Sequence, residues 1–278
     1  MQNAGIAALG LDWRYVAFET RPEDLAQAVE GARAMRYVGL NLTVPHKLLA
    51  VDLMDELDES ARTWGAVNTV VFEGRDSEGG WHPLGQWPGG DVQGVRTRGY
   101  NTDADAIVRS LREDLNCEPR GADILLLGAG GAGRVAALKL AAEGARRLWL
   151  VNRTESKAEK VAEEIRGAHP GVEVALGYPT TDTRLDLILN ATSLGLRTDD
   201  PSPLDEARFA VDGAKAVYDM VYRPERTKLL QTAQRADCRV ADGTGMLLWQ
   251  GVKALEIWCG QTAPAGAMRD ALNEHLNR

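Results

Sequence analysis

Apolar residues gather in short runs that alternate with segments of helical spacing, and the clearest case lies in the middle of the chain. The apolar run 123–127 breaks into the glycine-rich stretch 128–133, and the alanine-rich segment 135–143 that follows has the composition of a helix. A second apolar run, 147–151, comes next. This order predicts a strand, a tight turn, a helix and a second strand, as in a βαβ unit.

The same alternation extends toward both ends of the chain. After the βαβ unit we expect buried strands at 186–190, 216–219 and 239–241, and helices within 224–236, from about 245, and over 264–276. Before it we expect helix 1–9, strand 13–18, a helix from Thr20, strand 38–44, a strand around 67–72 and a helix over 104–115. Alternating strands and helices predict an α/β fold, and 278 residues fit one large or two modest domains, of which we expect two.

Residues 73–98 interrupt this alternation. They are rich in glycine and polar residues and contain Trp81, Pro83, Trp87 and Pro88. Loops of this length are uncommon unless they are functional or disordered. We therefore expect a long hairpin loop here, with a lid, a surface excursion and plain disorder as the alternatives.

The glycine-rich stretch has the spacing GxGxxG, directly after a predicted strand and before a predicted helix. Gly128 allows the tight turn, Gly130 lets the backbone approach a pyrophosphate, and Gly133 allows close packing of helix and sheet. The unpaired N–H groups at the start of the helix then face the anion. The sequence predicts a dinucleotide site at Gly128, Ala129, Gly130, Gly131, Ala132 and Gly133, and a turn kept only for packing is the alternative.

The end of the second strand indicates which dinucleotide is bound. NAD-binding domains usually place an acidic residue there for the ribose hydroxyls. This chain has Asn152, Arg153 and Thr154, with Lys157 a few residues on. Arginine can grip a 2′-phosphate with a bidentate fork, whereas an acid would repel it. These four residues therefore favour NADP, and a solvated basic helix start is the alternative.

Composition narrows the classes of function. The formal net charge is −8, whereas nucleic-acid and membrane-surface proteins need a basic face. No apolar run approaches the roughly 20 residues of a membrane span, and the three cysteines and four histidines lack metal-ligand spacing. We expect a cytoplasmic protein with a small-molecule substrate, no nucleic-acid or membrane partner and no metal, and a homodimer is left open.

Lys47 and Asp103 stand at the starts of two predicted helices. A lysine in a first turn opposes the helix dipole, which points to a use other than stability. The carboxyl ends of strands are also where open α/β sheets place ligands. We weigh this role equally against an exposed structural lysine, and we expect the neighbouring His46 to be structural. Asp103 on its own has the position of a helix cap.

Several segments together resemble the shikimate dehydrogenase family in order and spacing. They are Asn41–Lys47, Gly65–Thr69, Gly99–Asp103, the glycine stretch, Asn152–Thr154, Asn190–Gly195, Asp219–Pro224 and Gly243–Gln250. The resemblance spans nearly the whole chain, and several motifs in register make it far more specific than any one of them. It implies an NADP-dependent enzyme of aromatic amino acid biosynthesis that interconverts shikimate and 3-dehydroshikimate.

The resemblance also implies a role for individual parts of the chain. Residues 1–103, completed by helices within 246–278, correspond to a smaller α/β substrate domain. Residues 104–245 correspond to a Rossmann-type domain with a doubly wound parallel sheet for NADP. Carried onto matching positions, Lys47 and Asp103 become the catalytic pair. The substrate residues become Thr43, Asn68, Tyr222 and Gln250, and Thr192 and Gly243 join the cofactor residues.

One departure from the family concerns the substrate carboxylate. Members usually begin with a strand and a loop of the form His-Ser-x-Ser-Pro, whose hydroxyls bind that carboxylate. Here Met1, Gln2 and Asn3 correspond to the helix just after the loop. We expect a start codon upstream, and in this form an exposed sheet edge and an incomplete carboxylate site.

Other functions remain open at this point. Relatives divide between shikimate and quinate, so mixed specificity is one alternative. A dinucleotide-binding protein without catalysis is another, because the serine loop is absent. Methylenetetrahydrofolate dehydrogenase shares a two-domain plan, but the segments around Asp103 and Gln250 fit it less well.

Overall fold

The structure is a computed structural model that describes residues 1–222 and 226–276. The chain forms two compact units, which differ in sheet type. The first unit comprises Met1–Asp103 and Leu248–His275, and the second consists mainly of Ala104–Leu247. Among the described helices, none combines the length and the apolar character that crossing a membrane requires.

The second unit contains a six-stranded sheet in which every pairing is parallel. Its order is β11-β10-β9-β6-β7-β8. The strands are β6 (Asp123–Leu127), β7 (Arg147–Val151), β8 (Glu173–Leu176), β9 (Leu187–Asn190), β10 (Ala216–Asp219) and β11 (Arg239–Asp242). From β6 the order runs outward in two directions, which is the doubly wound arrangement of dinucleotide-binding folds. The predicted α/β fold class is therefore confirmed.

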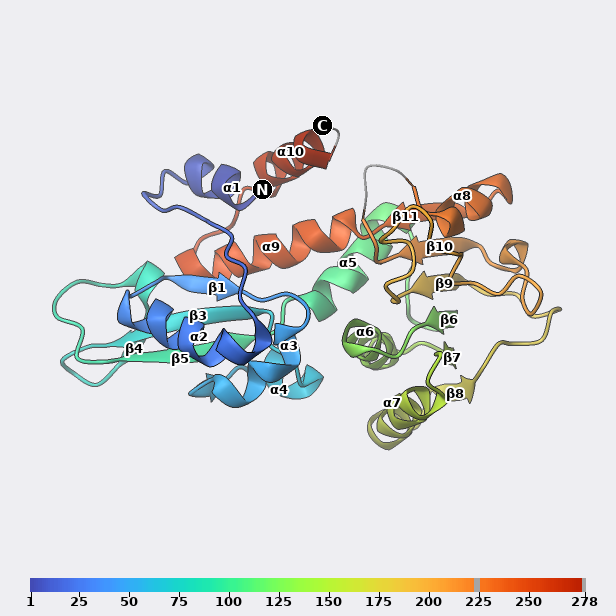
Figure 1. Cartoon of the computed structure of the whole chain (residues 1–278), viewed down its shortest axis with the longest axis horizontal. Helices are drawn as coiled ribbons and strands as arrows, with labels where there is room; N and C mark the ends of the chain where they lie inside the picture. The colour runs from blue at the N-terminus through green and yellow to red at the C-terminus, as the bar shows by residue number, and fades with distance from the viewer. Residues whose placement is uncertain (223–225, 277–278) are drawn as a thin grey trace. The chain divides into compact units, whose positions relative to one another are not determined.

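Burial explains why these segments are strands. All five residues of β6 and all four of β9 and β10 are buried, as expected when helices cover both faces of a parallel sheet. The covering helices include α5 (Asp103–Leu115), α6 (Gly131–Ala142), α7 (Glu155–Ala168) and α8 (Lys228–Arg235), with a 3₁₀ turn at Val211–Gly213. In Figure 1, α6 and α7 lie side by side along one side of the sheet.

The ends of five strands form one row across this sheet. Register places Leu127 beside Val151 and Asn190, and Asp219 beside Asn190 and Asp242. The loops that follow the strands therefore leave the same edge of the sheet. This carboxyl edge is where open α/β sheets bind ligands, at the point where the strand order reverses.

The first unit has a smaller mixed sheet of five strands. The order is β1-β3-β5-β2, with β4 paired to β3, and the pairings are antiparallel except for β2 with β5. The strands are β1 (Gly39–Asn41), β2 (Glu56–Leu57), β3 (Thr69–Arg75), β4 (Trp81–Pro83) and β5 (Val95–Tyr100). Strand β1 lies at one end of this order. It covers only Gly39–Asn41, so it is shorter than the strand predicted at 38–44.

The first unit also contains helices. They are α1 (Gln2–Ala8), α2 (Leu25–Ala34), α3 (His46–Leu49), α4 (Glu59–Trp64), α9 (Thr244–Cys259) and α10 (Ala265–Leu276), with 3₁₀ turns at Pro22–Asp24, Val51–Leu53 and Leu84–Gln86. A core of Leu25, Val29, Val70 and Phe72 joins α2 to β3. Trp258 of α9 donates from Nε1 to the Val70 carbonyl at 3.0 Å, which fixes α9 on the strands (Figure 1).

The predicted strand 13–18 is wrong. No strand is assigned over residues 11–20, and Val16 and Phe18 are exposed. The alternation of partly buried Trp13 and Tyr15 is real, but a strand needs a neighbouring backbone. Instead, the Asn3 side chain accepts from Tyr15 N and donates to Tyr15 O, both at 2.8 Å. A side chain thus satisfies the backbone groups that a strand partner would have bonded.

The long loop predicted at 73–98 is also wrong, because much of it is paired structure. Strand β3 extends to Arg75, β4 pairs back onto it, and β5 begins at Val95. The tryptophans explain the order. The Arg96 guanidinium stacks over Trp81 at 4.5 Å, and Trp87 packs so closely on Gly74 that a Cβ there would lie 2.6 Å from its ring.

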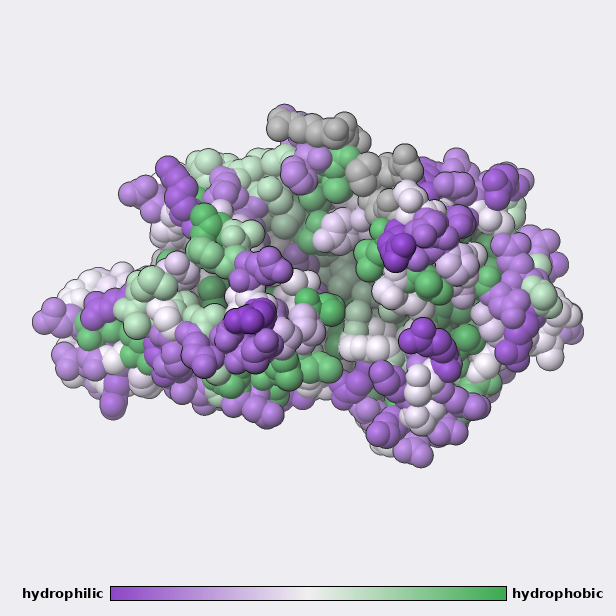
Figure 2. Space-filling model, viewed as in Figure 1, coloured by the Kyte–Doolittle hydropathy of each residue, from purple (hydrophilic) through white to green (hydrophobic). Residues whose placement is uncertain are grey.

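The helices expected elsewhere are present, with shifted ends. The helix predicted within 224–236 appears as α8, and the residues 223–225 that precede it lie outside the described residues. The exposed face of a covering helix is polar where its apolar residues face the sheet. Figure 2 shows a mostly hydrophilic surface over α7, whose buried residues are confined to Ala158, Val161, Ala162 and Ile165.

Candidate active site

Lys47 and Asp103 form an ion pair in the first unit. Lys47 Nζ donates to Asp103 Oδ2 at 2.7 Å, with 27% of the lysine side chain and 10% of the aspartate side chain exposed. Lys47 lies on the single-turn helix α3, and its carbonyl accepts from Val67 N at 2.8 Å. Asp103 begins α5, and Asn101 Oδ1 accepts its N–H. Two fixed backbone positions therefore present a charged pair that solvent still reaches.

Asn68 and Gln250 are joined through a residue that the sequence analysis did not single out. Thr102 N donates to Asn68 Oδ1 at 2.8 Å, and Asn68 Nδ2 donates to Thr102 Oγ1 at 3.0 Å. Thr102 Oγ1 in turn donates to the Gln250 carbonyl at 3.1 Å. Asn68 is 1% exposed, so this network is a buried polar cluster that lies beside Asp103 in the chain.

Thr43 lies close to the same residues. Its neighbour Leu42 donates from its backbone N to the Asn68 carbonyl at 2.8 Å, and the Thr43 carbonyl accepts from His46 N. Thr43 is exposed. The first unit therefore brings the predicted residues Thr43, Lys47, Asn68 and Asp103 into one neighbourhood, with Gln250 linked to it through Thr102.

His46 is buried beside the lysine. It is 8% exposed, and its Nδ1 has no hydrogen-bond partner among the described residues. Its burial fits a structural role, but the sequence predicts a histidine whose polar atoms are satisfied, and Nδ1 is not.

The glycine stretch forms a tight turn between β6 and α6. Gly128 has φ +104°, a conformation that side chains disfavour. A Cβ on Gly133 would lie 2.1 Å from the Gly128 carbonyl oxygen, so helix and turn approach closely there. A Cβ on Gly130 would meet no atom within 4 Å, and residues 130–132 are exposed at the start of α6. This open helix N-terminus can receive an anion.

Asn152 ties the glycine turn to the loop after β7. Its Oδ1 accepts from Ala129 N at 2.9 Å, and its Nδ2 donates to the Thr154 carbonyl at 2.7 Å. Arg153, Thr154 and Lys157 are exposed around the start of α7. One amide group therefore joins the glycine turn to the backbone of the segment that carries these three side chains.

Thr192, Tyr222 and Gly243 follow β9, β10 and β11 at the same edge of the sheet. Thr192 N and Oγ1 both donate to Asn190 Oδ1, at 2.9 and 2.7 Å. A Cβ on Gly243 would lie 2.2 Å from the Met220 carbonyl oxygen, so these two loops touch through backbone. Tyr222 is 44% exposed. The rest of its motif, Arg223 and Pro224, lies outside the described residues.

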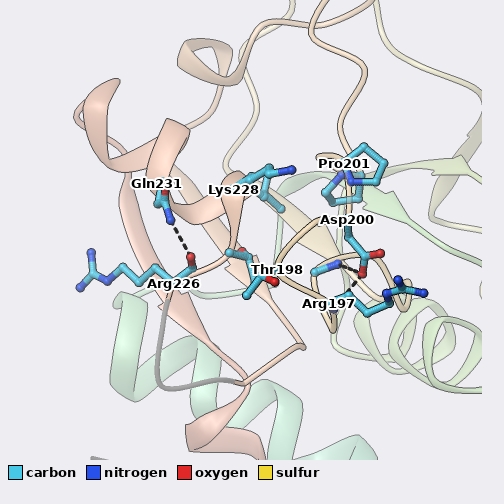
Figure 3. A pocket seen from close by; sticks show the side chains of 11 residues that line it. Arg197, Thr198, Asp200, Pro201, Arg226, Lys228 and Gln231 are labelled. Carbon is cyan, nitrogen blue, oxygen red and sulfur yellow. Dashed lines mark hydrogen bonds between the residues drawn. The ribbon is translucent and has the colours of Figure 1, made fainter.

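A pocket of about 150 Å³ opens between the loop after Gly195 and the start of α8. Figure 3 shows Arg197, Arg226 and Lys228 around it. Asp200 Oδ2 accepts from the backbone N of Gly195 and Arg197 and closes the loop on itself. The pocket thus has a basic rim, and its walls are the loop after β9 and the start of α8 with the two residues before it.

Three residues that organise these sites, Thr102, Asn190 and Asp219, were not predicted as site residues from the sequence. All three are buried, and each bonds the backbone or side chain of a predicted site residue or its neighbour. A usable signal for Asn190 and Asp219 is an Asx residue that ends an apolar run, where its side chain can bond the backbone two residues on.

Comparison with known proteins identifies the family. A model described as "Shikimate dehydrogenase substrate binding domain" matches residues 1–70, "Shikimate / quinate 5-dehydrogenase" matches 111–195, and "Shikimate 5'-dehydrogenase C-terminal domain" matches 243–272. A shikimate dehydrogenase (NADP(+)) of Geobacter metallireducens is 42% identical over 284 residues, which cover 100% of this chain and 92% of the relative. The chain belongs to the shikimate dehydrogenase family.

Similar solved structures match the chain over nearly its whole length. Shikimate 5-dehydrogenase from Thermus thermophilus, in complex with NADP(H) and shikimate, is 32% identical with a TM-score of 0.78, covering 99% of this chain and 92% of that chain. The 5-ketofructose reductase of Gluconobacter sp. strain CHM43 is 33% identical with the same TM-score and coverage. The likeness therefore extends to proteins named for different substrates.

Proposed function

We propose that this member of the shikimate dehydrogenase family oxidises shikimate to 3-dehydroshikimate with NADP, and catalyses the reverse reduction. The observation that carries the proposal is the Lys47–Asp103 pair, with Nζ and Oδ2 2.7 Å apart. Its two residues match the family motifs, and they lie beside the polar network of Asn68, Thr102 and Gln250.

Oxidation of an alcohol removes a hydride from carbon and a proton from oxygen. In our proposal, the neutral amine form of Lys47 Nζ takes the hydroxyl proton, and the resulting ammonium group returns it in the reverse direction. Asp103 Oδ2 holds Nζ in place and compensates its charge when it is protonated. Such general acid–base catalysis typically contributes about 10²- to 10⁴-fold. Thr43 and Gln250 would bind the hydroxyls of the substrate ring. The hydrogen bonds between Asn68 and Thr102 would hold these neighbouring residues in place.

The second unit has features that fit NADP. The exposed backbone of residues 130–132 at the start of α6 would bind the pyrophosphate, and the clear space at Gly130 allows close approach. Arg153, Thr154 and Lys157 would bind the 2′-phosphate. Thr192 and Gly243 would line the nicotinamide side, and Tyr222 would lie near the substrate. When bound, the cofactor supplies the hydride acceptor.

The direct test is reduction of NADP in the presence of shikimate, followed by NADPH absorbance. Quinate in place of shikimate, and NAD in place of NADP, serve as parallel arms. A second protein with the family's Ser-containing loop added upstream tests the carboxylate site. We expect NADPH formation with shikimate to exceed that with quinate. Tight NADP binding with no turnover by either protein would support the non-catalytic dinucleotide-binding function instead.

A further inference from the structure

Three neighbouring strands of the second unit end in the same local motif. Asn190, Asp219 and Asp242 are the last residues of β9, β10 and β11, and register places them side by side. Each accepts at Oδ1 the backbone N–H two residues on, from Thr192, Val221 and Thr244, at 2.9 to 3.0 Å. Such turns redirect the chain at the strand end. The carboxyl edge therefore carries a row of three matched turns.

Asp219 connects the elements of this row. Its Oδ1 accepts from Asn190 Nδ2 at 2.8 Å as well as from Val221 N, and its Oδ2 accepts from Thr227 Oγ1 at 2.7 Å. Asn190 Nδ2 also donates to the Leu194 carbonyl. One fully buried carboxylate thus holds the loop after β9, the loop after β10 and the cap of α8.

The same contacts shape the surface that these loops present. Gly195 packs on Thr227 so closely that a Cβ would lie 3.0 Å from its methyl group. Gly195 and Thr227 both line the pocket in Figure 3. On the other side of the network, Asn190 holds Thr192, and the Val221 bond precedes Tyr222 directly. A shift of Asp219 would therefore move Thr192 and Tyr222 together.

We propose that Asp219 is a positioning residue for the reaction: through Asn190, Val221 and Thr227 it sets Thr192 and Tyr222 in the arrangement that turnover requires. This inference rests on the proposed function, which assigns those two residues to the nicotinamide and substrate side. Asp219 would contact neither the substrate nor the cofactor. Its effect is on geometry, and a misplacement of about 1 Å at an active site can cost about 10²-fold in rate.

The test compares Asp219→Ala with Asp219→Asn. Alanine removes all three acceptor contacts, and we expect kcat to fall by about 10²-fold. Asparagine keeps an oxygen for Val221 N and Asn190 Nδ2, and its amide group can donate to Thr227 Oγ1, so we expect it to restore most of the turnover. NADP affinity, measured by binding without substrate, should change far less than kcat in both variants. Equal loss in the two variants, or no loss in Asp219→Ala, would overturn the proposal.

Tyr218→Phe is the matched control for stability. Tyr218 precedes Asp219 in β10, is equally buried, and its hydroxyl lies 2.9 Å from Ser110 Oγ. Loss of that bond should lower the melting temperature without changing kcat. If Tyr218→Phe lost as much kcat as Asp219→Ala, the loss in both variants would be due to lower stability, and the positioning role of Asp219 would be rejected.

A second variant covers the case in which Asp219→Ala does not fold. Asn190→Ala breaks the link from the other strand while Asp219 keeps Val221 N and Thr227 Oγ1. We expect the same loss of kcat with NADP binding largely retained, and unchanged kcat would contradict the proposal. The parent protein's turnover with shikimate is measured in the same series. Absence of that turnover would reject the proposed function, whereas its presence with unaffected variants would reject only the role of Asp219.

Discussion

Lys47 Nζ and Asp103 Oδ2 lie 2.7 Å apart although 56 residues separate them in the chain. The pair depends on the turn from β1 into α3 and on the start of α5, so both segments must fold for it to form. We expect Lys47→Ala to lower kcat by about 10²- to 10⁴-fold while NADP still binds with unchanged affinity. Steady-state kinetics and cofactor titration check the two parts.

Lys215→Ala is the matched control for that variant. Lys215 Nζ also pairs with an aspartate, Asp186, at 2.8 Å, but its side chain is exposed, and it lies at the start of β10, away from the carboxyl edge. Its loss should leave kcat unchanged. Normal turnover in Lys47→Ala would remove this lysine from the proton transfer.

Arg153→Asp should change the cofactor preference. The exposed guanidinium at the start of α7 is replaced by a carboxylate, which repels a 2′-phosphate and can accept from ribose hydroxyls. We expect NADP affinity to fall by more than tenfold, a loss of more than about 1.4 kcal/mol, and NAD affinity to change little. Arg184→Asp, which makes the same charge change just before β9, should leave the preference intact. If Arg153→Asp lowered the affinities for NADP and NAD equally, Arg153 would not be the residue that binds the 2′-phosphate.

Two glycines of the turn should respond differently to alanine. At Gly130 a Cβ meets no atom within 4 Å, and φ is −75°, so Gly130→Ala should fold normally. The added methyl group would occupy the space of the pyrophosphate, and NADP affinity should drop sharply. At Gly133 the Cβ would lie 2.1 Å from a backbone oxygen, so Gly133→Ala should lower the melting temperature. Equal behaviour of the two variants in thermal unfolding and NADP titration would contradict this assignment.

Asp219 should make stability depend on pH. Burial is the main cause that raises the pKa of its carboxyl above the usual 3.8, and neighbouring Asp242 acts in the same direction. Between 3.8 and the raised pKa the native state binds more protons than the unfolded chain, so stability falls as pH rises through that window. Asp219→Asn does not titrate. We expect its free energy of unfolding, relative to the parent, to increase from about pH 4 to about pH 7 in urea titrations. If this difference in unfolding free energy stayed constant or became smaller over that pH range, the prediction would be wrong.

The βαβ core could be predicted from the sequence because its signals are local. Strands 123–127 and 147–151 match β6 and β7 to the residue, since each is a mainly apolar run bounded by a turn or a charge change. Strand 13–18 failed because pairing depends on a distant neighbour, and here Asn3 took that place. Strand β4 was missed because Trp81–Pro83 is only three residues long and ends in proline.

In the candidate site, too, the residues with a local signal could be predicted and those that depend on distant partners could not. Lys47, the glycine stretch and Arg153 stand out locally, through a misplaced charge, a spacing and a missing acid. The links made by Thr102, Asn152 and Asp219 depend on partners 23 to 148 residues away, or on strand register, which periodicity does not encode. The roles of Asp103 and Gln250 came from resemblance, because an aspartate at a helix start and a glutamine on a helix are otherwise ordinary.

Asn152 imposes a constraint on anyone who redesigns the cofactor preference. One amide joins the pyrophosphate turn, through Ala129, to the segment that would read the 2′-phosphate, through Thr154. Arg153 and Lys157 can be exchanged without breaking that joint, because their side chains are exposed and the joint is made by Asn152. A library that also varies residue 152 would loosen both halves of the dinucleotide site at once, and its selected variants would confuse weaker binding with altered preference.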